Sequence, residues 1–179
     1  CNNAAHPRIN FAARNTTSPK IQTAMKEITI NCEFEHFLCK DQGRCWIPTT
    51  LNLADEEAQL FVDALDKFKE CNPDELKNVN TDYGFFPSGI YAYLFKVLPF
   101  ALAKKITGAV GANFIRTTLE DLLKQCPYVY ENDIEENSEI SKEQWQQLSF
   151  DEKFDLLLKC NPYLSDLSTW EFLNAEICK

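Results

Sequence analysis

Glycine, histidine and methionine are scarce in this chain of 179 residues, which contains 5 glycines, 2 histidines and 1 methionine. The low glycine content argues against a turn-rich β-sandwich, while 13 phenylalanines favour long elements with bulky side chains between them. Two histidines, in a chain whose cysteines form bridges, leave no credible Ser-His-Asp or Cys-His catalytic set. We therefore expect a mostly helical protein that is not an enzyme and needs no cofactor.

Metal-binding patterns are also lacking. No Cys-x-x-Cys pair occurs, and neither His6 nor His36 has a partner at ligand spacing, so a zinc site is not expected. Residues 133–144 have the oxygen spacing of a calcium-binding EF-hand loop. However, Ser138 stands where the sharp turn requires glycine, and Gln144 stands where a glutamate should close the site. The sequence therefore predicts no metal ion.

Cysteine is abundant instead, and its even number is typical of disulfides in a secreted protein. Asn15-Thr16-Thr17 adds a predicted glycosylation site at Asn15. Because no signal segment precedes Cys1, we expect a mature extracellular protein whose signal peptide has been removed; a lipoprotein with lipid on Cys1 is the alternative. The cysteines predicted to form disulfides are Cys1, Cys32, Cys39, Cys45, Cys71, Cys126, Cys160 and Cys178.

The formal charge of -9 is unevenly distributed. Residues 32–82 carry a net charge of -7 and residues 120–179 a net charge of -9, whereas residues 83–119 contain four basic residues and no acidic one. Nucleic-acid binding requires lysines and arginines clustered on one face, so nucleic acid is excluded as an expected partner.

Residues 85–115 form the most apolar part of the chain, but Lys96, Pro99 and the Lys104-Lys105 pair interrupt it. An uninterrupted run of about 18 apolar residues is needed to span a bilayer, so no stable membrane span is expected. We predict a central apolar helix over residues 87–106, bent at Pro99. A membrane-surface helix and the wall of an apolar pocket are the alternatives. The pocket would be lined by Phe85, Phe86, Tyr91, Tyr93, Phe95 and Phe100.

Two segments end in the same Cys-Asn-Pro sequence, at Cys71 and Cys160. Counting back from each cysteine, both have Phe at ten, an acid at eight, a large apolar residue at six, Asp at five and a large apolar residue at three. Upstream, Cys39 and Cys126 each close a stretch that resembles a helix. Two amphipathic helices would share the apolar spacing by themselves, but not the Cys-Asn-Pro corner, where Asn caps and Pro opens a new helix. We interpret this as an internal duplication.

The predicted fold is therefore all-α, a disulfide-crosslinked helical protein built from two divergent repeats around a central helix. It comprises an N-terminal extension over 1–18, repeat 1 over 19–86, the central helix over 87–107 and repeat 2 over 108–179. Capping boxes begin at Ser141, Ser149 and Ser168. Helices are expected over residues 19–39, 54–71, 73–79, 87–106, 109–125, 142–148, 150–160 and 163–177.

The duplication restricts the disulfides to two symmetric sets. One joins Cys39 to Cys71 and Cys126 to Cys160; the other joins Cys39 to Cys160 and Cys71 to Cys126. We prefer the first set, because residues 40–53 are long enough to lead the chain back along a helix of about 25 Å.

The segment from Cys160-Asn-Pro-Tyr163 to Cys178 looks like a cysteine-tyrosine-cysteine motif, and Cys71 with Tyr83 or Tyr91, running to Cys126, looks like a second. In this the chain resembles the bicycle family of aphid salivary effectors. The resemblance implies a secreted salivary protein, delivered into a plant during feeding and acting without known catalysis. It singles out Tyr83, Tyr91 and Tyr163 as binding residues.

The function predicted from the sequence is that of a secreted, non-enzymatic effector or interaction protein. Its acidic faces would bind an unknown host or receptor protein. The alternative is a secreted carrier of a small apolar ligand, with its pocket against the central helix beside Tyr91 and Phe95.

Overall fold

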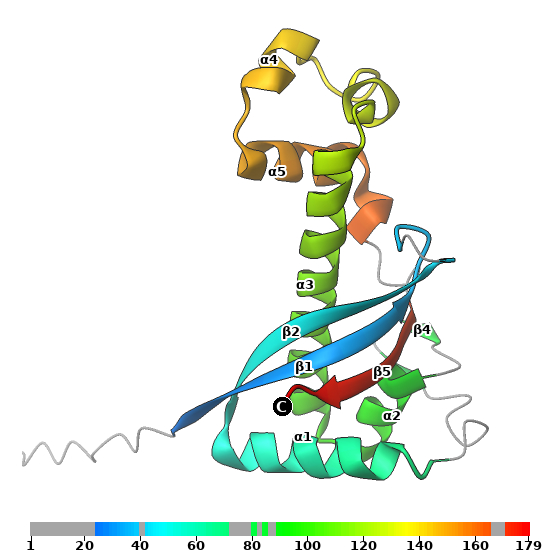
Figure 1. The fold of residues 1–179 in the computed structure, drawn as a ribbon, viewed down its shortest axis with the longest axis vertical. Coiled ribbons are helices and arrows are strands. Elements are labelled where there is room, and N and C mark those ends of the chain that lie inside the picture. Colours follow the sequence, from blue (N-terminus) through cyan, green and yellow to red (C-terminus); the bar gives the residue numbers. More distant parts are fainter. Residues whose placement is uncertain (1–23, 40–41, 72–79, 82–83, 86–88, 166–170) are drawn as a thin grey trace, which may run out of the picture.

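The structure is a computed structural model that describes residues 24–39, 42–71, 80–81, 84–85, 89–165 and 171–179. It has a body and an arm, joined by one long helix (Figure 1). The body contains β1 (Met25–Glu35), β2 (Arg44–Ala54), α1 (Asp55–Phe68), β3 (Asn80–Thr81), β4 (Gly84–Phe85), α2 (Gly89–Val97) and β5 (Glu171–Ile177). The joining helix is α3 (Phe100–Gln125), and the arm contains the π-helical turn η2 (Tyr130–Ile134), α4 (Lys142–Gln147), α5 (Phe150–Cys160) and the 3-10 turn η3 (Pro162–Ser165).

The body is built on an antiparallel sheet with the strand order β2-β1-β5, so the all-α prediction is wrong. β1 occupies residues for which we predicted a helix over 19–39; the part over 19–23 lies outside the described residues. The physical reason is the strict alternation along β1, where every second side chain from Ile28 to Phe34 is buried. A period of two, with β-branched residues, is the pattern of a half-buried strand.

The last strand corrects a second prediction. Residues 171–177 form β5 rather than the end of a helix over 163–177, and only η3 remains helical in that range among the described residues. β5 pairs with β1, bringing Ala175 opposite Cys32, with a register shift between Glu33 and Phe34. β5, the last strand in the sequence, therefore forms one edge of the sheet beside β1, the first strand.

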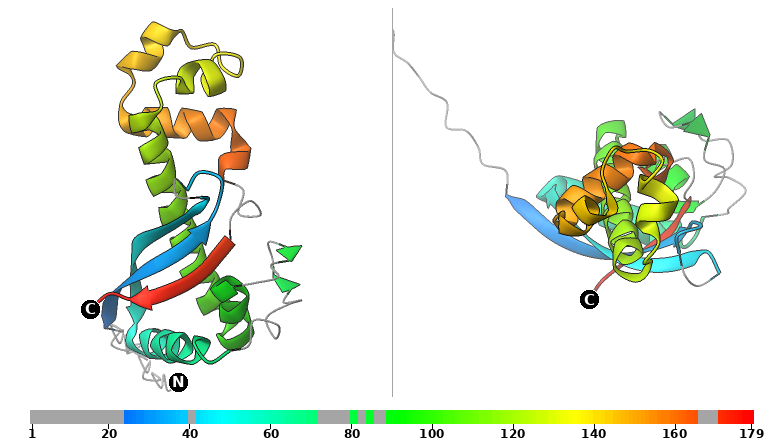
Figure 2. Two further views of the ribbon diagram at one scale, coloured as in Figure 1. Left: turned by 45° about the vertical axis from the view of Figure 1, so that its right-hand side comes forward. Right: turned by 90° about the horizontal axis from the view of Figure 1, so that it is seen from above.

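Three helices pack around the sheet, and α3 crosses its inner face (Figure 2). The largest side chains of the body core that are less than 2% exposed are aromatic: Phe34, Phe61, Tyr91, Phe114 and Phe172. Tyr93 Oη donates a hydrogen bond of 2.8 Å to Ala64 O, which fastens α2 to α1. Lys105 Nζ lies 3.1 Å from Glu57 Oε2 and links α3 to α1.

The predicted central helix is divided at Pro99. α2 ends at Val97, and Pro99 is the N-cap of α3, where its missing N–H costs nothing. No described helix is both long enough and apolar enough to cross a membrane.

The arm has a small apolar core of its own, to which α3 contributes Leu119. The other buried members are Val129, Tyr130, Ile134, Trp145, Leu157 and Leu164. The predicted helices over 142–148 and 150–160 are confirmed, and both begin with complete capping boxes, at Ser141 and Ser149. Arg116 of α3 lies 4.7 Å from the ring centres of both Phe150 and Phe154 and 2.6 Å from Asp151 Oδ1, which attaches α5 to α3.

The two segments used to infer a duplication differ upstream of their shared ending. Cys39 follows strand β1, whereas Cys126 follows helix α3. Of the predicted boundaries, the helix over 54–71 corresponds to α1. The helix over 73–79 and the capping box at Ser168 lie outside the described residues, and Glu171 begins β5. A fold of two similar helical halves is therefore wrong.

Gly89 allows a close approach between the backbones of α2 and β5. Its φ is +82°, and a Cβ atom there would lie 2.6 Å from Phe172 O. We predict that Gly89→Ala lowers the free energy of unfolding by at least about 2 kcal/mol, because the left-handed conformation and the backbone clash both oppose a side chain. Chemical denaturation measures the change.

Two other glycines are matched controls. Gly43 has a φ of +79° but would place its Cβ 3.6 Å from the nearest atom, so Gly43→Ala should cost about 1 kcal/mol. Gly108 has open space around it within α3, so Gly108→Ala should stabilise by about 0.5–1 kcal/mol. Equal effects of all three substitutions would contradict the described packing of α2 on β5.

Candidate functional site at the hairpin tip

The turn between β1 and β2, residues 36–43, is called here the hairpin tip; residues 40 and 41 lie outside the described residues. His36 N donates to Gly43 O at 2.8 Å, and Cys39 N donates to His36 O at 3.0 Å. Gln42 and Gly43 have φ values of 54° and 79°, which are the left-handed residues that reverse the chain. These bonds give the tip a defined backbone shape.

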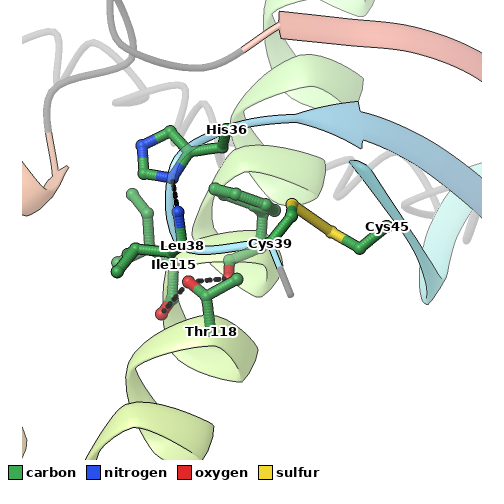
Figure 3. Close-up of a disulfide and its surroundings, with 7 residues drawn as sticks. His36, Leu38, Cys39, Cys45, Ile115 and Thr118 are labelled. Atoms are coloured by element: carbon green, nitrogen blue, oxygen red, sulfur yellow. Dashed lines mark hydrogen bonds between the residues drawn. A yellow bond between two sulfur atoms is a disulfide. The ribbon is translucent and has the colours of Figure 1, made fainter. Parts of the chain in front are cut away.

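A disulfide between Cys39 and Cys45 closes the tip, with a Cα–Cα distance of 5.5 Å (Figure 3). Of the two predicted pairing sets, neither contains this bond, so the predicted partner of Cys39, whether Cys71 or Cys160, is wrong. The other described cysteines, Cys32, Cys71, Cys126, Cys160 and Cys178, carry free thiols in this structure, and Cys1 lies outside the described residues.

His36 supports the tip from within. Its ring is 4% exposed, lies 4.1 Å from the ring centre of Phe37, and meets Phe114 of α3 edge-on at 5.3 Å. Its Nδ1 accepts a hydrogen bond of 3.1 Å from Leu38 N (Figure 3). Burial lowers the pKa of the imidazole from its ordinary value of 6.5, so the ring is neutral and Nδ1 is able to accept.

Three open grooves in the described part of the chain meet at the tip. The first, of about 350 Å³, lies between the disulfide, Trp46 and α3. The second, of about 450 Å³, lies between Phe37, Leu38 and the end of α3 at Cys126. The third, of about 420 Å³, is lined by Glu35, His36, Phe37, Gly43 and Glu171. The hairpin tip therefore forms a ridge between these three grooves.

Two exposed aromatic rings stand on this ridge. Phe37 is 60% exposed and Tyr163 of η3 is 52% exposed, and their rings stack with centres 6.4 Å apart. Trp46, beside the first groove, is 43% exposed. We call Phe37, Trp46 and Tyr163, with the three grooves, the aromatic surface. It joins residues of the hairpin to a residue of the arm.

Of the three tyrosines that the sequence singled out, the structure places only Tyr163 here. Tyr91 lies in the body core at 1% exposure, with its ring centre 5.1 Å from that of Phe95. Tyr83 and Asn15 lie outside the described residues. Phe37 was not singled out; it lies two residues before Cys39, in a stretch that was predicted to be helical.

Two polar side chains around the tip, those of Arg44 and Thr118, have structural partners. Arg44 lies 3.8 Å from a Glu33 oxygen and 3.9 Å from a Glu35 oxygen. The buried hydroxyl of Thr118 donates to Phe114 O at 2.8 Å, within α3. No three His, Cys, Asp or Glu side chains in the described ranges are grouped so that they could hold a metal ion. The tip therefore exposes aromatic rings beside charged side chains, among them Glu35, Arg44 and Glu171.

Comparisons of the chain with protein-family models, with curated proteins and with solved structures found no match.

His36 makes the stability of the tip depend on pH. Below pH 6.5 the unfolded chain binds a proton that the folded chain, with its lowered pKa, does not, so stability is fully present above that pH and falls as pH drops toward the folded pKa. We predict that the wild type loses more stability between pH 7 and pH 5 than His36→Asn. The asparagine keeps an acceptor for Leu38 N–H but does not titrate.

Chemical denaturation at both pH values gives the two differences. Groups common to both proteins, including Glu35 and Glu171 in the neighbouring groove, cancel in the comparison. An identical loss in the wild type and in His36→Asn would mean that the ring is protonated or exposed in the folded protein.

The described thiols should differ widely in reactivity. Cys32 is fully buried, and burial raises its pKa to about 12, whereas Cys178 is exposed. Because the thiolate is the reactive form, native alkylation at pH 8 without reductant should label Cys178 first and Cys32 last. Cys39 and Cys45 should stay unlabelled until a reductant is added. Peptide mass spectrometry checks the order, and a Cys39–Cys71 peptide pair or rapid labelling of Cys32 would contradict the structure.

Proposed function

We propose that this protein is a secreted, non-enzymatic interaction protein that binds a partner protein through the aromatic surface at the hairpin tip. The observation that carries the proposal is the stacked, exposed pair of Phe37 and Tyr163. More than half of the surface of each of these two residues stays exposed to water. A partner that covers them would remove this apolar area from water, which favours binding.

The construction of the surface supports this proposal. Aromatic residues dominate the energetics of protein interfaces, particularly when they are held in place before binding. Phe37 follows the buried ring of His36. The disulfide, two backbone–backbone hydrogen bonds and the bond from Leu38 N to the His36 ring restrict the turn that presents it. Grooves of about 350–450 Å³ beside the ridge are of a size that accepts partner side chains.

The Cys39–Cys45 disulfide supports the secreted part of the proposal, because such bonds persist in oxidising compartments. Membership of the bicycle family, and with it delivery into a plant, stays a prediction. The carrier alternative receives no specific support, because Tyr91 and Phe95 pack against neighbouring rings in the body.

Substitution of the two rings tests the proposal. Affinity capture from tissue that the protein encounters, followed by direct titration of the recovered protein, gives a dissociation constant. Phe37→Ala and Tyr163→Ala are each expected to weaken binding about 30-fold, since truncating a central aromatic contact costs about 2 kcal/mol.

Matched controls are Phe100→Ala and Tyr128→Ala, whose side chains are 51% and 64% exposed outside the aromatic surface. They should change the dissociation constant less than about twofold, and circular dichroism should show all four variants folded. Binding that survives both tip substitutions, or falls equally with the controls, would show that the aromatic surface is not the contact.

A further inference from the structure

The arm carries a second surface that the proposed function does not use. Two adjoining grooves, of about 600 and 680 Å³, share Glu139, Ile140, Leu148 and Glu152. Together they form one depression, called here the arm groove, between α5 and the segment that leads into α4. Along α5 it runs from Glu152 to Cys160, two helical turns or about 12 Å.

The floor of the arm groove is apolar. Ile140, Leu148 and Leu156 line it, and all three are only partly buried although they pack against the arm core. Their outer surfaces remain open to water. An apolar strip about two helical turns long matches the row of apolar side chains on one face of a short amphipathic helix.

The rim of the groove is acidic. Three carboxylates, Glu139, Glu152 and Asp155, face one ammonium group, that of Lys159. Ser149 N donates a hydrogen bond to Glu152 and lowers the pKa of that carboxyl, so it is charged at neutral pH. Within the described residues, Glu139 and Asp155 form no ion pair.

The charge of the whole arm reinforces that of the rim. Residues 120–160 contain 11 acidic and 4 basic residues, a net charge of -7. Three of the four lysines are engaged: Lys124 pairs with Glu120, Lys142 pairs with Glu131, and Lys153 lies over the ring of Trp145. The resulting negative potential attracts a basic ligand and repels an acidic one.

From the apolar floor and the acidic rim, we infer that the arm groove binds a short basic amphipathic helix of a partner protein. Leucine or similar side chains of that helix lie on Ile140, Leu148 and Leu156. Its lysine or arginine side chains pair with Glu139, Glu152 and Asp155. This is a binding site separate from the aromatic surface, and it does not depend on the function proposed for that surface.

The probe is a synthetic helical peptide of about 14 residues with leucine along one face and lysine elsewhere, titrated by calorimetry into the full chain. Its counterpart carries glutamate in place of every lysine. The lysine peptide should bind, and raising the salt concentration from 0.05 to about 0.5 M should weaken it several-fold. The glutamate peptide should not bind.

Substitutions locate the binding. Glu139→Lys with Asp155→Lys reverses the charge of two rim residues and should weaken the lysine peptide at least about tenfold. Glu135→Lys with Glu136→Lys makes the same change of net charge on exposed arm residues outside the groove, and should weaken it less than about threefold. Leu156→Ala should weaken it several-fold by removing part of the floor.

Three results would overturn the inference. Equal losses from the two lysine pairs would show that the peptide responds only to overall charge. Equal binding of both peptides would remove the role of the acidic rim. Self-association of the chain, abolished by the rim pair while the peptide fails to bind, would make a second copy of the chain the occupant.

Discussion

The burial of one face of a three-stranded sheet against α3 is the constraint on which the rest of the structure depends. Phe34 of β1 lies 4.5 Å from the ring centre of Phe114 on α3 and 5.4 Å from that of Phe172 on β5. These three rings come from β1, α3 and β5, which are far apart in the sequence, and they lie in one apolar core. The same helix extends beyond that core and supplies Leu119 to the core of the arm, so α3 determines where the arm stands relative to the sheet.

This arrangement explains why the hairpin tip lies where body and arm meet. β1 and β2 carry the tip along α3, where His36 packs against Phe114 and Leu38 packs against the arm core. η3 follows α5 and brings Tyr163 back to Phe37. The aromatic surface is therefore a product of tertiary structure, because no short segment of the chain contains it. The arm groove, by contrast, is built within residues 137–160 and depends on local helix geometry.

Features formed by local sequence could be predicted, whereas features formed by tertiary structure could not. α4 and α5 were predicted because their capping boxes are local signals. At Pro99 a bend in one helix was predicted because proline lacks the N–H that a helix interior needs, and the structure has a division between α2 and α3 there. β1 was misjudged because an apparent match between Cys39 and Cys126 was given more weight than the alternation of buried residues from Ile28 to Phe34. β5 was not recognisable because its short segment becomes a strand only by pairing with β1, far away in the sequence.

Part of the candidate site could be predicted from the sequence. Tyr163 was named, but its stacking partner Phe37 was assigned to a helix. The predicted disulfides did not include Cys39–Cys45, because they assumed a symmetry between two halves that the fold does not have. These cysteines are six positions apart in the sequence, and a short reversal with a left-handed glycine between them favours a local bridge.

The most direct test of this account is a nuclear magnetic resonance measurement of contacts between β1 and β5. Thr29 accepts a hydrogen bond from Cys178 N, so Cys32 and Ala175 form a non-hydrogen-bonded antiparallel pair whose Hα atoms face each other. The account predicts a strong Hα–Hα nuclear Overhauser effect between Cys32 and Ala175. Its absence, together with helical contacts between residues three apart over 171–177, would contradict the closure of the sheet by the end of the chain.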